Sequence, residues 1–441
     1  MSIYIIKNIY YLTVFVVAIS MIYNLSRFLI KSTRPNIILI TVDSLRQDHL
    51  GCYGYAQNIS PNIDKLARTG AIFSQAISQS SWTWPSVHSI ITSQYPSSHG
   101  VYFWDQYLSG STSNFVQLLK DKGCATYFIS RHGGLTRLNQ GFTAFEDVSE
   151  NKSSNITDKA ELLIGENKNK QFFLWLHYME THSNSYCDLP TEKRSAEDLT
   201  AKAIEDCSIR YDLGISNVDR QLGILLAKLK DLGIYKNTII ILAADHGEEM
   251  GEHGYYYTHG GALWDSTLRV PLIFSYPALF KKDKIIKQQV ELIDIAPTIL
   301  AILKIKPPEG IEGKSLIPLI SKHVEGDREY TFSEVKENMD DLAGSPYNSA
   351  TEWNYTKFSI RGDNYKLIVT LDKYGRQYEL YDLEKDPQEL INIAETKQEQ
   401  LQIMKVKLEK WINRPKPKSA SSMKPLDEKI KKKLKSLGYL Q

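Results

Sequence analysis

With 441 residues, the chain is long enough for one large α/β domain and a smaller second domain. Its 53 Lys and Arg residues nearly balance its 51 Asp and Glu residues, which argues against a bulk electrostatic partner such as nucleic acid. The four cysteines, Cys52, Cys124, Cys187 and Cys207, are too few and too scattered for a disulfide scaffold or a zinc ribbon. Cys187 and Cys207 could pair, although we expect them to be buried separately.

The N-terminal segment carries no charge between Lys7 and Arg27 and is almost wholly apolar. Its length is close to the ~20 residues that a helix needs to cross a bilayer, and no small-x-small cleavage site follows it cleanly. We therefore expect residues 1–35 to form an uncleaved single-pass membrane anchor and a short linker. More positive charge follows the apolar stretch than precedes it, which favours a cytoplasmic globular part, but the difference is too small to fix the side of the membrane.

After the linker, apolar strands alternate with helices. The pattern predicts strands at 36–42, 125–130, 171–178, 237–244 and 270–276, and helices at 61–69, 114–122, 196–233 and 293–303. Strands that alternate with helices imply a mostly parallel central sheet with helices on both faces, which is an α/β fold. We assign this pattern to a first domain over residues 36–320.

The composition changes after about residue 319. Residues 357–371 and 376–386 are typical of antiparallel strands joined by a turn, and a charged amphipathic helix follows at about 397–412. The sequence therefore predicts a small α+β subdomain with an antiparallel sheet over residues 321–413. A basic tail over residues 414–441 completes the chain.

Two of the predicted strands end directly at acidic residues. The first ends at Asp43, and the strand at 237–244 ends at Asp245, which His246 follows. Ligands of open parallel sheets bind just beyond the carboxyl ends of the strands. If the two strands are neighbours, these side chains meet, and carboxylates with an imidazole form a set suited to a divalent cation.

A hydroxyl lies at the start of another predicted helix. Pro85 suits the first turn, so Thr83 falls at or just before the N-terminus, where backbone N–H groups attract an anion such as phosphate or sulfate. A lone Thr in this place is more often a helix cap than a nucleophile. A nearby metal ion would change that, because it lowers the pKa of the hydroxyl.

In its ordered motifs, the chain resembles the sulfatase branch of the alkaline phosphatase superfamily over roughly residues 36–395. The motifs are VDSLRQDHLGCYG, SPNIDKLARTGAIF, TWPSVHSIITSQYPSSHG, GFTAFED, HYMETH, ADHGEEMGEHG with a later HGG, RVPLIF, DIAPTIL, IRGDNYKL and ELYDLEKDPQE. Single motifs of this kind are weak, but accidental similarity in ten ordered motifs is very improbable.

The resemblance implies roles for particular positions. It implies that Asp43, Asp245 and His246 are metal ligands and that Thr83 is both the nucleophile and a ligand. It implies that His182 and His259 hold the anionic group and assist the leaving oxygen.

Several neighbouring residues leave more than one interpretation open. We expect Arg46 and His88 to contact the substrate anion, although Arg46 could equally form an inter-loop salt bridge and His88 could face solvent. His177 and His253 could either support the site or be structural.

The chain departs from the formylglycine sulfatases. Thr83 cannot be converted to formylglycine, and Val87 replaces the motif arginine. Ser44 replaces the second aspartate of the first strand, and His246 replaces the metal-binding asparagine. Fewer carboxylates and an imidazole favour one manganese, zinc or magnesium ion over calcium. The pattern is more similar to relatives with a threonine nucleophile, which act on phosphate esters and phosphonates, while a sulfate ester stays open.

The sequence therefore predicts a metal-dependent hydrolase of sulfate or phosphate-type esters that forms a covalent Thr83 ester. The alternatives are a phospho-group transferase that acts on a lipid or glycan, and a degenerate anion-binding membrane protein. The expected partners are a small anionic ester, or a sulfated or phosphorylated glycan or lipid, and the membrane. The resemblance implies a location outside the cytoplasm, whereas the charges that flank the apolar N-terminal segment favour a cytoplasmic globular part.

Overall fold

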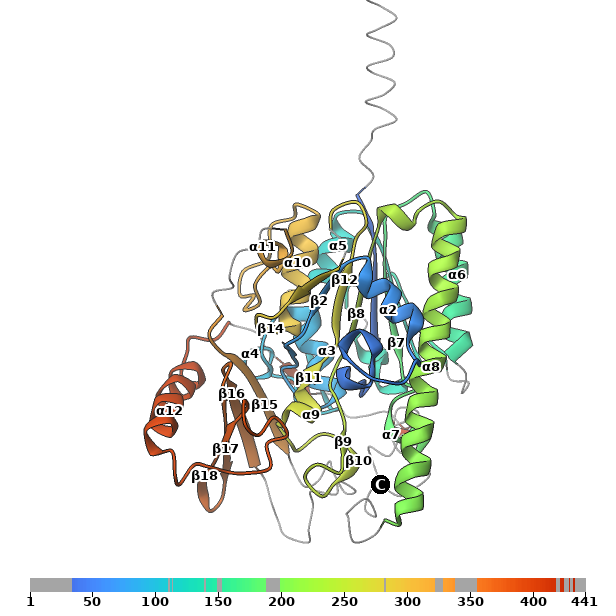
Figure 1. Cartoon of the computed structure of the whole chain (residues 1–441). Coiled ribbons are helices and arrows are strands. Elements are labelled where there is room, and N and C mark those ends of the chain that lie inside the picture. The colour runs from blue at the N-terminus through green and yellow to red at the C-terminus, as the bar shows by residue number, and fades with distance from the viewer. Residues whose placement is uncertain are drawn as a thin grey trace, which may run out of the picture. The chain divides into compact units, whose positions relative to one another are not determined.

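Three apolar segments far apart in the sequence form the centre of the sheet in the computed structural model (Figure 1). They are β1 (Asn36–Val42), β7 (Phe172–Tyr178) and β8 (Thr238–Ala244), and every residue in them is buried. β1 lies between β7 and β8 and pairs in parallel with both. Continuous apolar runs are expected for strands that helices cover on both faces, so the predicted α/β architecture is confirmed.

The structure describes residues 34–432 except 110–111, 113, 139, 149–152, 188–198, 281–282, 322–327, 338–354, 418–420, 424–427 and 429–430. The central sheet has the strand order β13-β2-β12-β8-β1-β7-β5-β6. Its outer strands are β2 (Ala71–Phe73), β5 (Ala125–Ser130), β6 (Ala144–Asp147), β12 (Leu272–Ser275) and β13 (Lys284–Ile286). β12 runs antiparallel to β2 and β8, while the other pairs are parallel.

Helices cover both faces of this sheet (Figure 1). On one face α8 (Ala201–Asp231) packs against α2 (Pro61–Arg68) and α6 (Ser153–Asn167). On the other, α3 (Thr83–Thr92) packs against α5 (Phe115–Asp121) and α10 (Ile295–Ile302). α8 is amphipathic and buries a stripe that includes Ile215, Leu222 and Leu229.

Shorter elements connect these layers. They are β3 (Ala76–Ile77), α4 (Pro96–His99), β4 (Gln106–Leu108), α7 (Ser183–Tyr186), β9 (Glu249–Met250), β10 (Tyr256–Thr258), α9 (Asp265–Leu268), β11 (Arg269–Val270), β14 (Val290–Glu291), α11 (Ile317–Ser321) and β19 (Ser421–Met423). β3 joins β11 and β14 in a small sheet beside α3, and β4 pairs with β19.

The C-terminal region forms the predicted antiparallel sheet. Its strands are β15 (Thr331–Glu337), β16 (Tyr355–Arg361), β17 (Tyr365–Asp372) and β18 (Gly375–Asp382), in that order, and α12 (Gln398–Ile412) packs on it. This sheet and helix have an apolar cluster of their own, which includes Ile360, Leu380, Met404 and Trp411. α12 covers this sheet, and an antiparallel sheet needs only one buried face.

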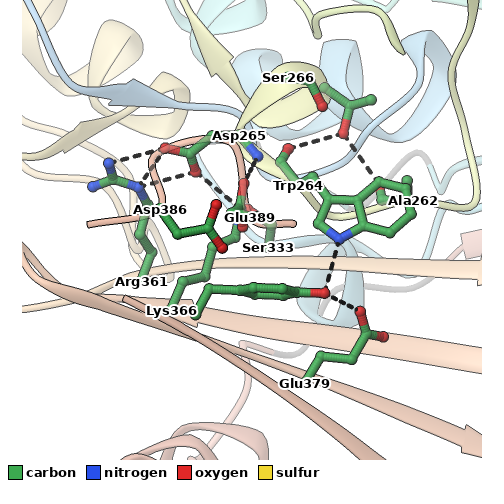
Figure 2. Close-up of polar contacts among 12 residues, drawn as sticks. Ala262, Trp264, Asp265, Ser266, Ser333, Arg361, Lys366, Glu379, Asp386 and Glu389 are labelled. Atoms are coloured by element: carbon green, nitrogen blue, oxygen red, sulfur yellow. Dashed lines mark hydrogen bonds and ion pairs between the residues drawn. The ribbon is translucent and has the colours of Figure 1, made fainter. Parts of the chain in front are cut away.

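Charged side chains join the C-terminal sheet to α9 (Figure 2). Asp265 of α9 lies 3.0 Å from Arg361 Nη2 and 2.9 Å from Lys366 Nζ, and Lys366 Nζ also lies 2.9 Å from Glu389. Lys366 is fully buried, so its ammonium depends on these carboxylates. The network fixes α9, which directly follows the loop that carries His259.

Cys187 and Cys207 form a disulfide, so the prediction of separate burial is wrong. Twenty residues separate them in the sequence, and the fold brings the segment after β7 against the first turns of α8. The bridge therefore ties the segment that follows His182 to the longest described helix.

Removing this disulfide is expected to lower the free energy of unfolding by about 3 kcal/mol, because the bridge restricts the unfolded chain. The measurement is denaturant unfolding of the Cys187→Ala/Cys207→Ala variant beside the parent chain, with and without a thiol reductant. Cys52→Ala is the matched control, because Cys52 is a free cysteine. Equal stability of the parent chain in both conditions would contradict the prediction.

The predicted single-pass membrane anchor requires correction. In the ranges that the structure describes, no helix combines the length and apolar character that a bilayer span requires. Residues 1–33, on which the prediction rests, lie outside the described part of the chain. An N-terminal anchor is therefore not supported.

Candidate active site

Strand register brings two carboxylates together at the centre of the sheet. Val42 at the end of β1 pairs with Ala244 at the end of β8, so the next residues, Asp43 and Asp245, leave the sheet side by side. The chain turns sharply after Asp43, because Ser44 has a φ of 57°, a left-handed conformation that is uncommon outside glycine. Ser44 Oγ donates to Asp43 Oδ1 at 2.9 Å and so holds that carboxylate.

Thr83 lies against both strand ends. It is the first residue of α3 and is fully buried. Thr83 Oγ1 lies 3.1 Å from Asp43 Oδ2 and 3.2 Å from His246 Nε2. Farther along α3, Ser86 Oγ donates to the backbone oxygen of Asp245 at 2.6 Å. The structure thus brings the four predicted metal-site residues into one buried cluster.

The hydrogen bonds of His246 orient its ring. His246 Nδ1 lies 2.8 Å from the backbone oxygen of Gly247, which can only accept, so Nδ1 carries the proton. Nε2 therefore presents its lone pair to Thr83 and the carboxylates. Burial, followed by the charge of His259, lowers the pKa of His246 to about 4, which keeps the imidazole neutral and able to bind a cation.

Gly247 is required by close packing. A Cβ at this position would lie 2.0 Å from the backbone oxygen of Ser266. Gly247 N donates to the backbone oxygen of Thr267 at 2.7 Å. The glycine after His246 thus lets the loop pass against α9.

The two buried carboxylates have opposite pKa shifts. Burial alone would raise the pKa of Asp43, but its interactions with His182, His177 and His246 favour the carboxylate form and hold the pKa well below its usual value. Burial, together with the negative charge of Asp43, raises the pKa of Asp245 to about 7. Two such carboxylates repel each other in a site that water does not reach, so a bound cation would relieve the repulsion.

The donor set fits a divalent cation. Asp245 Oδ2 is buried and accepts no hydrogen bond from any described residue, although buried polar atoms are rarely left without partners. His246 Nε2 lies 3.6 Å from Asp43 Oδ1 and 3.7 Å from Asp245 Oδ2. One ion could reach all three atoms at bond lengths of about 2.0–2.2 Å. Two carboxylates and an imidazole suit Mn²⁺, Zn²⁺ or Mg²⁺.

Two more histidines lie beside this cluster. The ring centres of His246 and His259 are 4.4 Å apart, and those of His259 and His182 are 5.1 Å apart. Burial lowers the pKa of His259, but the charge of Glu248 and a 3.0 Å hydrogen bond to it raise the pKa above the usual value. Burial lowers the pKa of His182. The pair therefore combines a readily protonated imidazole with a neutral one.

The two predicted anion-binding side chains have other partners. Arg46 Nη2 lies 2.7 Å from Asp48, and Nη1 lies 2.5 Å from Glu252, so the guanidinium forms the inter-loop salt bridge that the sequence left open. His88 is buried against Trp84, and its Nδ1 lies 2.7 Å from the Trp84 backbone oxygen. Burial lowers the pKa of His88 to about 4. These contacts take the place of the expected contacts with a substrate anion, so we propose no substrate-binding role for Arg46 or His88.

The structure places three more residues beside the cluster. The sequence left the role of His177 open and did not assign Glu248 or His132 to the site. His177 of β7 groups with Asp43 and Asp245, with one donor atom of each within 4.8 Å of the others. Glu248 contacts His259. His132, just after β5, has its ring centre 6.4 Å from that of His177. The alternation of β7 would place His177 on one face, but only the strand order reveals that this face adjoins Asp43.

Comparisons with known proteins identify a family for this chain. The Sulfatase family matches residues 35–305, and the C-terminal region of N-sulphoglucosamine sulphohydrolase matches residues 251–416. The ulvan-active sulfatase of Formosa agariphila is 24% identical over 375 residues, which cover 74% of this chain and 72% of that protein. An arylsulfatase of Clostridium perfringens is 24% identical over 457 residues, which cover 83% and 91%.

Solved structures share the fold. The phosphonate monoester hydrolase of Agrobacterium radiobacter superposes with a TM-score of 0.70 at 19% identity, covering 86% of this chain and 95% of that one. BT4656, in complex with its substrate D-glucosamine-2-N,6-O-disulfate, has a TM-score of 0.69 at 21% identity, covering 87% and 99%. The chain belongs to the sulfatase family and is a sulfatase-like ester hydrolase.

Proposed function

We propose that this chain hydrolyses sulfate or phosphate-type esters with the help of one divalent cation and through a covalent Thr83 ester. One observation carries the proposal. The Thr83 hydroxyl lies within 3.2 Å of both Asp43 and His246 at the N-terminus of a buried helix. A hydroxyl that served only as a helix cap would instead bond to its own helix. Thr83 follows the N-cap Trp82, and its side-chain contacts go to Asp43 and His246.

Asp43, Asp245, His246 and Thr83 would hold the cation. When bound, the cation would lower the pKa of the Thr83 hydroxyl and offset charge on the nonbridging oxygens of the ester. The mixed oxygen and nitrogen donors favour Mn²⁺, Zn²⁺ or Mg²⁺ over Ca²⁺.

Protein groups would perform the remaining steps. Thr83 Oγ1 passes its proton to Asp43 Oδ2, to which it donates a hydrogen bond, and attacks sulfur or phosphorus. The bond from that atom to the leaving oxygen breaks as the new bond forms. His259 donates a proton to the leaving oxygen, and Glu248 holds the imidazole in place. His182 and the N-terminus of α3 stabilise the anionic group. Water then attacks the Thr83 ester, gives a proton to the neutral His259, and releases sulfate or phosphate. The proton held by Asp43 returns to Thr83 Oγ1 and restores the hydroxyl.

The substrate class is an anionic ester of a small molecule, a glycan or a lipid. BT4656 and the phosphonate monoester hydrolase share the fold and act on a sulfated sugar and on phosphonate esters, respectively. A threonine nucleophile favours phosphate and phosphonate esters, because this residue cannot mature into formylglycine.

Activity on a panel of nitrophenyl esters tests the proposal. The full chain is assayed on the sulfate, phosphate, phosphodiester and phosphonate esters after metal removal and reloading with Mn²⁺, Zn²⁺, Mg²⁺ or Ca²⁺, with Thr83→Ala as the control. We expect turnover of at least one phosphorus ester that requires metal. An acid quench should yield a Thr83 peptide that carries the transferred group.

Other results of the panel would correct the proposal. Metal-dependent hydrolysis that survives in Thr83→Ala would refute the covalent ester, and turnover of the sulfate alone would refute the phosphorus preference. A Thr83 ester that forms but resists water would favour the transferase, which passes the group to another alcohol. Binding of esters without turnover in any metal would identify a degenerate anion-binding protein.

A further inference from the structure

A chain of buried polar contacts leads from the interior of the sheet to Asp43. Trp175 Nε1 lies 2.8 Å from Thr41 Oγ1, and Thr41 Oγ1 lies 2.8 Å from His177 Nδ1. His177 Nε2 then lies 3.4 Å from Asp43 Oδ2. Thr41 and His177 are paired residues of β1 and β7, and Thr41, His177 and Asp43 are all fully buried.

Hydrogen-bond chemistry fixes the direction of each contact. The indole N–H of Trp175 can only donate, so Thr41 Oγ1 accepts there. The hydroxyl proton of Thr41 then points to His177 Nδ1, since Thr41 has no other hydrogen-bond partner among the described side chains. In a neutral ring, Nδ1 is then the acceptor and Nε2 carries the proton. In a protonated ring, which the raised pKa of His177 favours, both nitrogens carry protons, so an Nε2–H group faces Asp43 in either state.

The tautomer separates His177 from His246. His246 presents a lone pair to the cluster because its Nδ1 donates to the Gly247 oxygen. His177 presents an N–H group, because Nε2 carries a proton both in the tautomer whose Nδ1 accepts from Thr41 and in the protonated ring. A nitrogen that carries a proton cannot bind a metal ion, although it can donate to a carboxylate that does. His177 Nε2 has no closer hydrogen-bond partner in the described part of the chain.

We propose that His177 is a positioning residue that donates a hydrogen bond to Asp43 and sets the orientation of this carboxylate toward the cation. The 3.4 Å separation between His177 Nε2 and Asp43 Oδ2 is at the long end of hydrogen-bond distances. Ser44, which occupies the position of the family's second aspartate, holds the opposite oxygen of Asp43. Asp43 is thus held from both sides by hydrogen-bond donors. The proposal rests on the proposed cation site.

The first test measures Mn²⁺ affinity by calorimetry on the full metal-free chain. Loss of the hydrogen bond in His177→Leu should weaken binding about 10–100-fold, the usual effect of removing a hydrogen-bond partner of a ligand. His177→Gln places an amide N–H near the position of Nε2 and should recover most of the affinity. Thr41→Val removes the hydroxyl that fixes the tautomer and should weaken binding about threefold to tenfold.

Thr126→Val is the matched control, because Thr126 is a fully buried threonine of β5 whose hydroxyl contacts Gly141 and Thr143 instead. It should lower stability without changing Mn²⁺ affinity. Parent-like affinity in His177→Leu, or equal losses in Thr126→Val and Thr41→Val, would overturn the proposal. A parent chain that binds no cation would refute the proposed function, and with it this inference.

The second test asks whether His177 is itself a ligand. Pulsed electron paramagnetic resonance of the Mn²⁺ form counts coordinated imidazole nitrogens. We expect the same count in the parent chain and in His177→Gln, because His246 alone contributes. A count that falls by one in His177→Gln would show direct coordination and would overturn the positioning role.

Discussion

Replacing Thr83 by valine is expected to reduce kcat/KM by a factor on the order of 10⁴ or more, because it removes the nucleophile and leaves only binding and charge stabilisation. Valine keeps the branched shape at a fully buried position. The free energy of unfolding should therefore change by no more than about 1 kcal/mol. Steady-state kinetics on the ester that the panel identifies, together with denaturant unfolding, provide the measurement.

Thr83→Ser is the control, because it keeps a hydroxyl at the start of α3. Serine should retain activity within about 100-fold of the parent chain, at a cost from the missing methyl group. A Thr83→Val variant that hydrolyses the ester as well as Thr83→Ser would show that Thr83 is a helix-end residue and that water attacks directly.

Replacing Asp245 by asparagine is expected to stabilise the metal-free protein by about 2 kcal/mol at pH 8, while weakening cation binding by at least about 100-fold. Both effects have one cause. The Asp245 carboxylate is fully buried beside Asp43, so its charge opposes folding until a cation compensates it. Removing the Asp245 charge therefore stabilises the metal-free protein. The same change weakens cation binding, because the cation needs this negative charge.

The pH dependence of this effect follows from the raised pKa. The pKa of Asp245 is about 7 in the folded chain and about 4 in an unfolded one. Between these values the folded state binds more protons, so the stability of the metal-free parent falls as pH rises through this range. The advantage of Asp245→Asn should therefore be small at pH 4 and complete above pH 7. Unfolding curves in a chelator at several pH values measure it.

Asp265→Asn is the matched control, and we expect it to change the free energy of unfolding in the opposite direction. Asp265 is also largely buried, but Arg361 and Lys366 hold its pKa below the usual value despite burial (Figure 2). Neutralising it leaves these cations uncompensated and should destabilise the protein by about 3–5 kcal/mol. Destabilisation of the metal-free protein by both variants would show that the site is not under electrostatic strain.

Local sequence patterns predicted much of the fold. The run at 36–42 is apolar at nearly every position, and the structure makes it a strand with the same bounds. Residues 125–130 form β5 as predicted, and α12 begins within one residue of the expected helix. These elements follow from hydrophobic periodicity and from turn residues, which act over a few neighbouring positions.

Contacts between distant residues were harder to predict. The sequence left the Arg46 ion pair open beside anion binding, and it favoured separate burial of Cys187 and Cys207. Each outcome depends on where another segment lies. Glu252 meets Arg46 because the loop after β8 folds over the end of β1, and no local pattern encodes that.

The sequence by itself determined the family, the strands that end in Asp43 and Asp245, and the helix that begins at Thr83, since these depend on residue type and short spacing. The tertiary structure decided what surrounds them. Strand order placed β7 beside β1, and so set His177 against Asp43. The physical reason is that side chains alternate along a strand, so the sequence of one strand assigns each residue to a face of the sheet. Which residue of another strand lies beside it is fixed only when the strands pair in order and register.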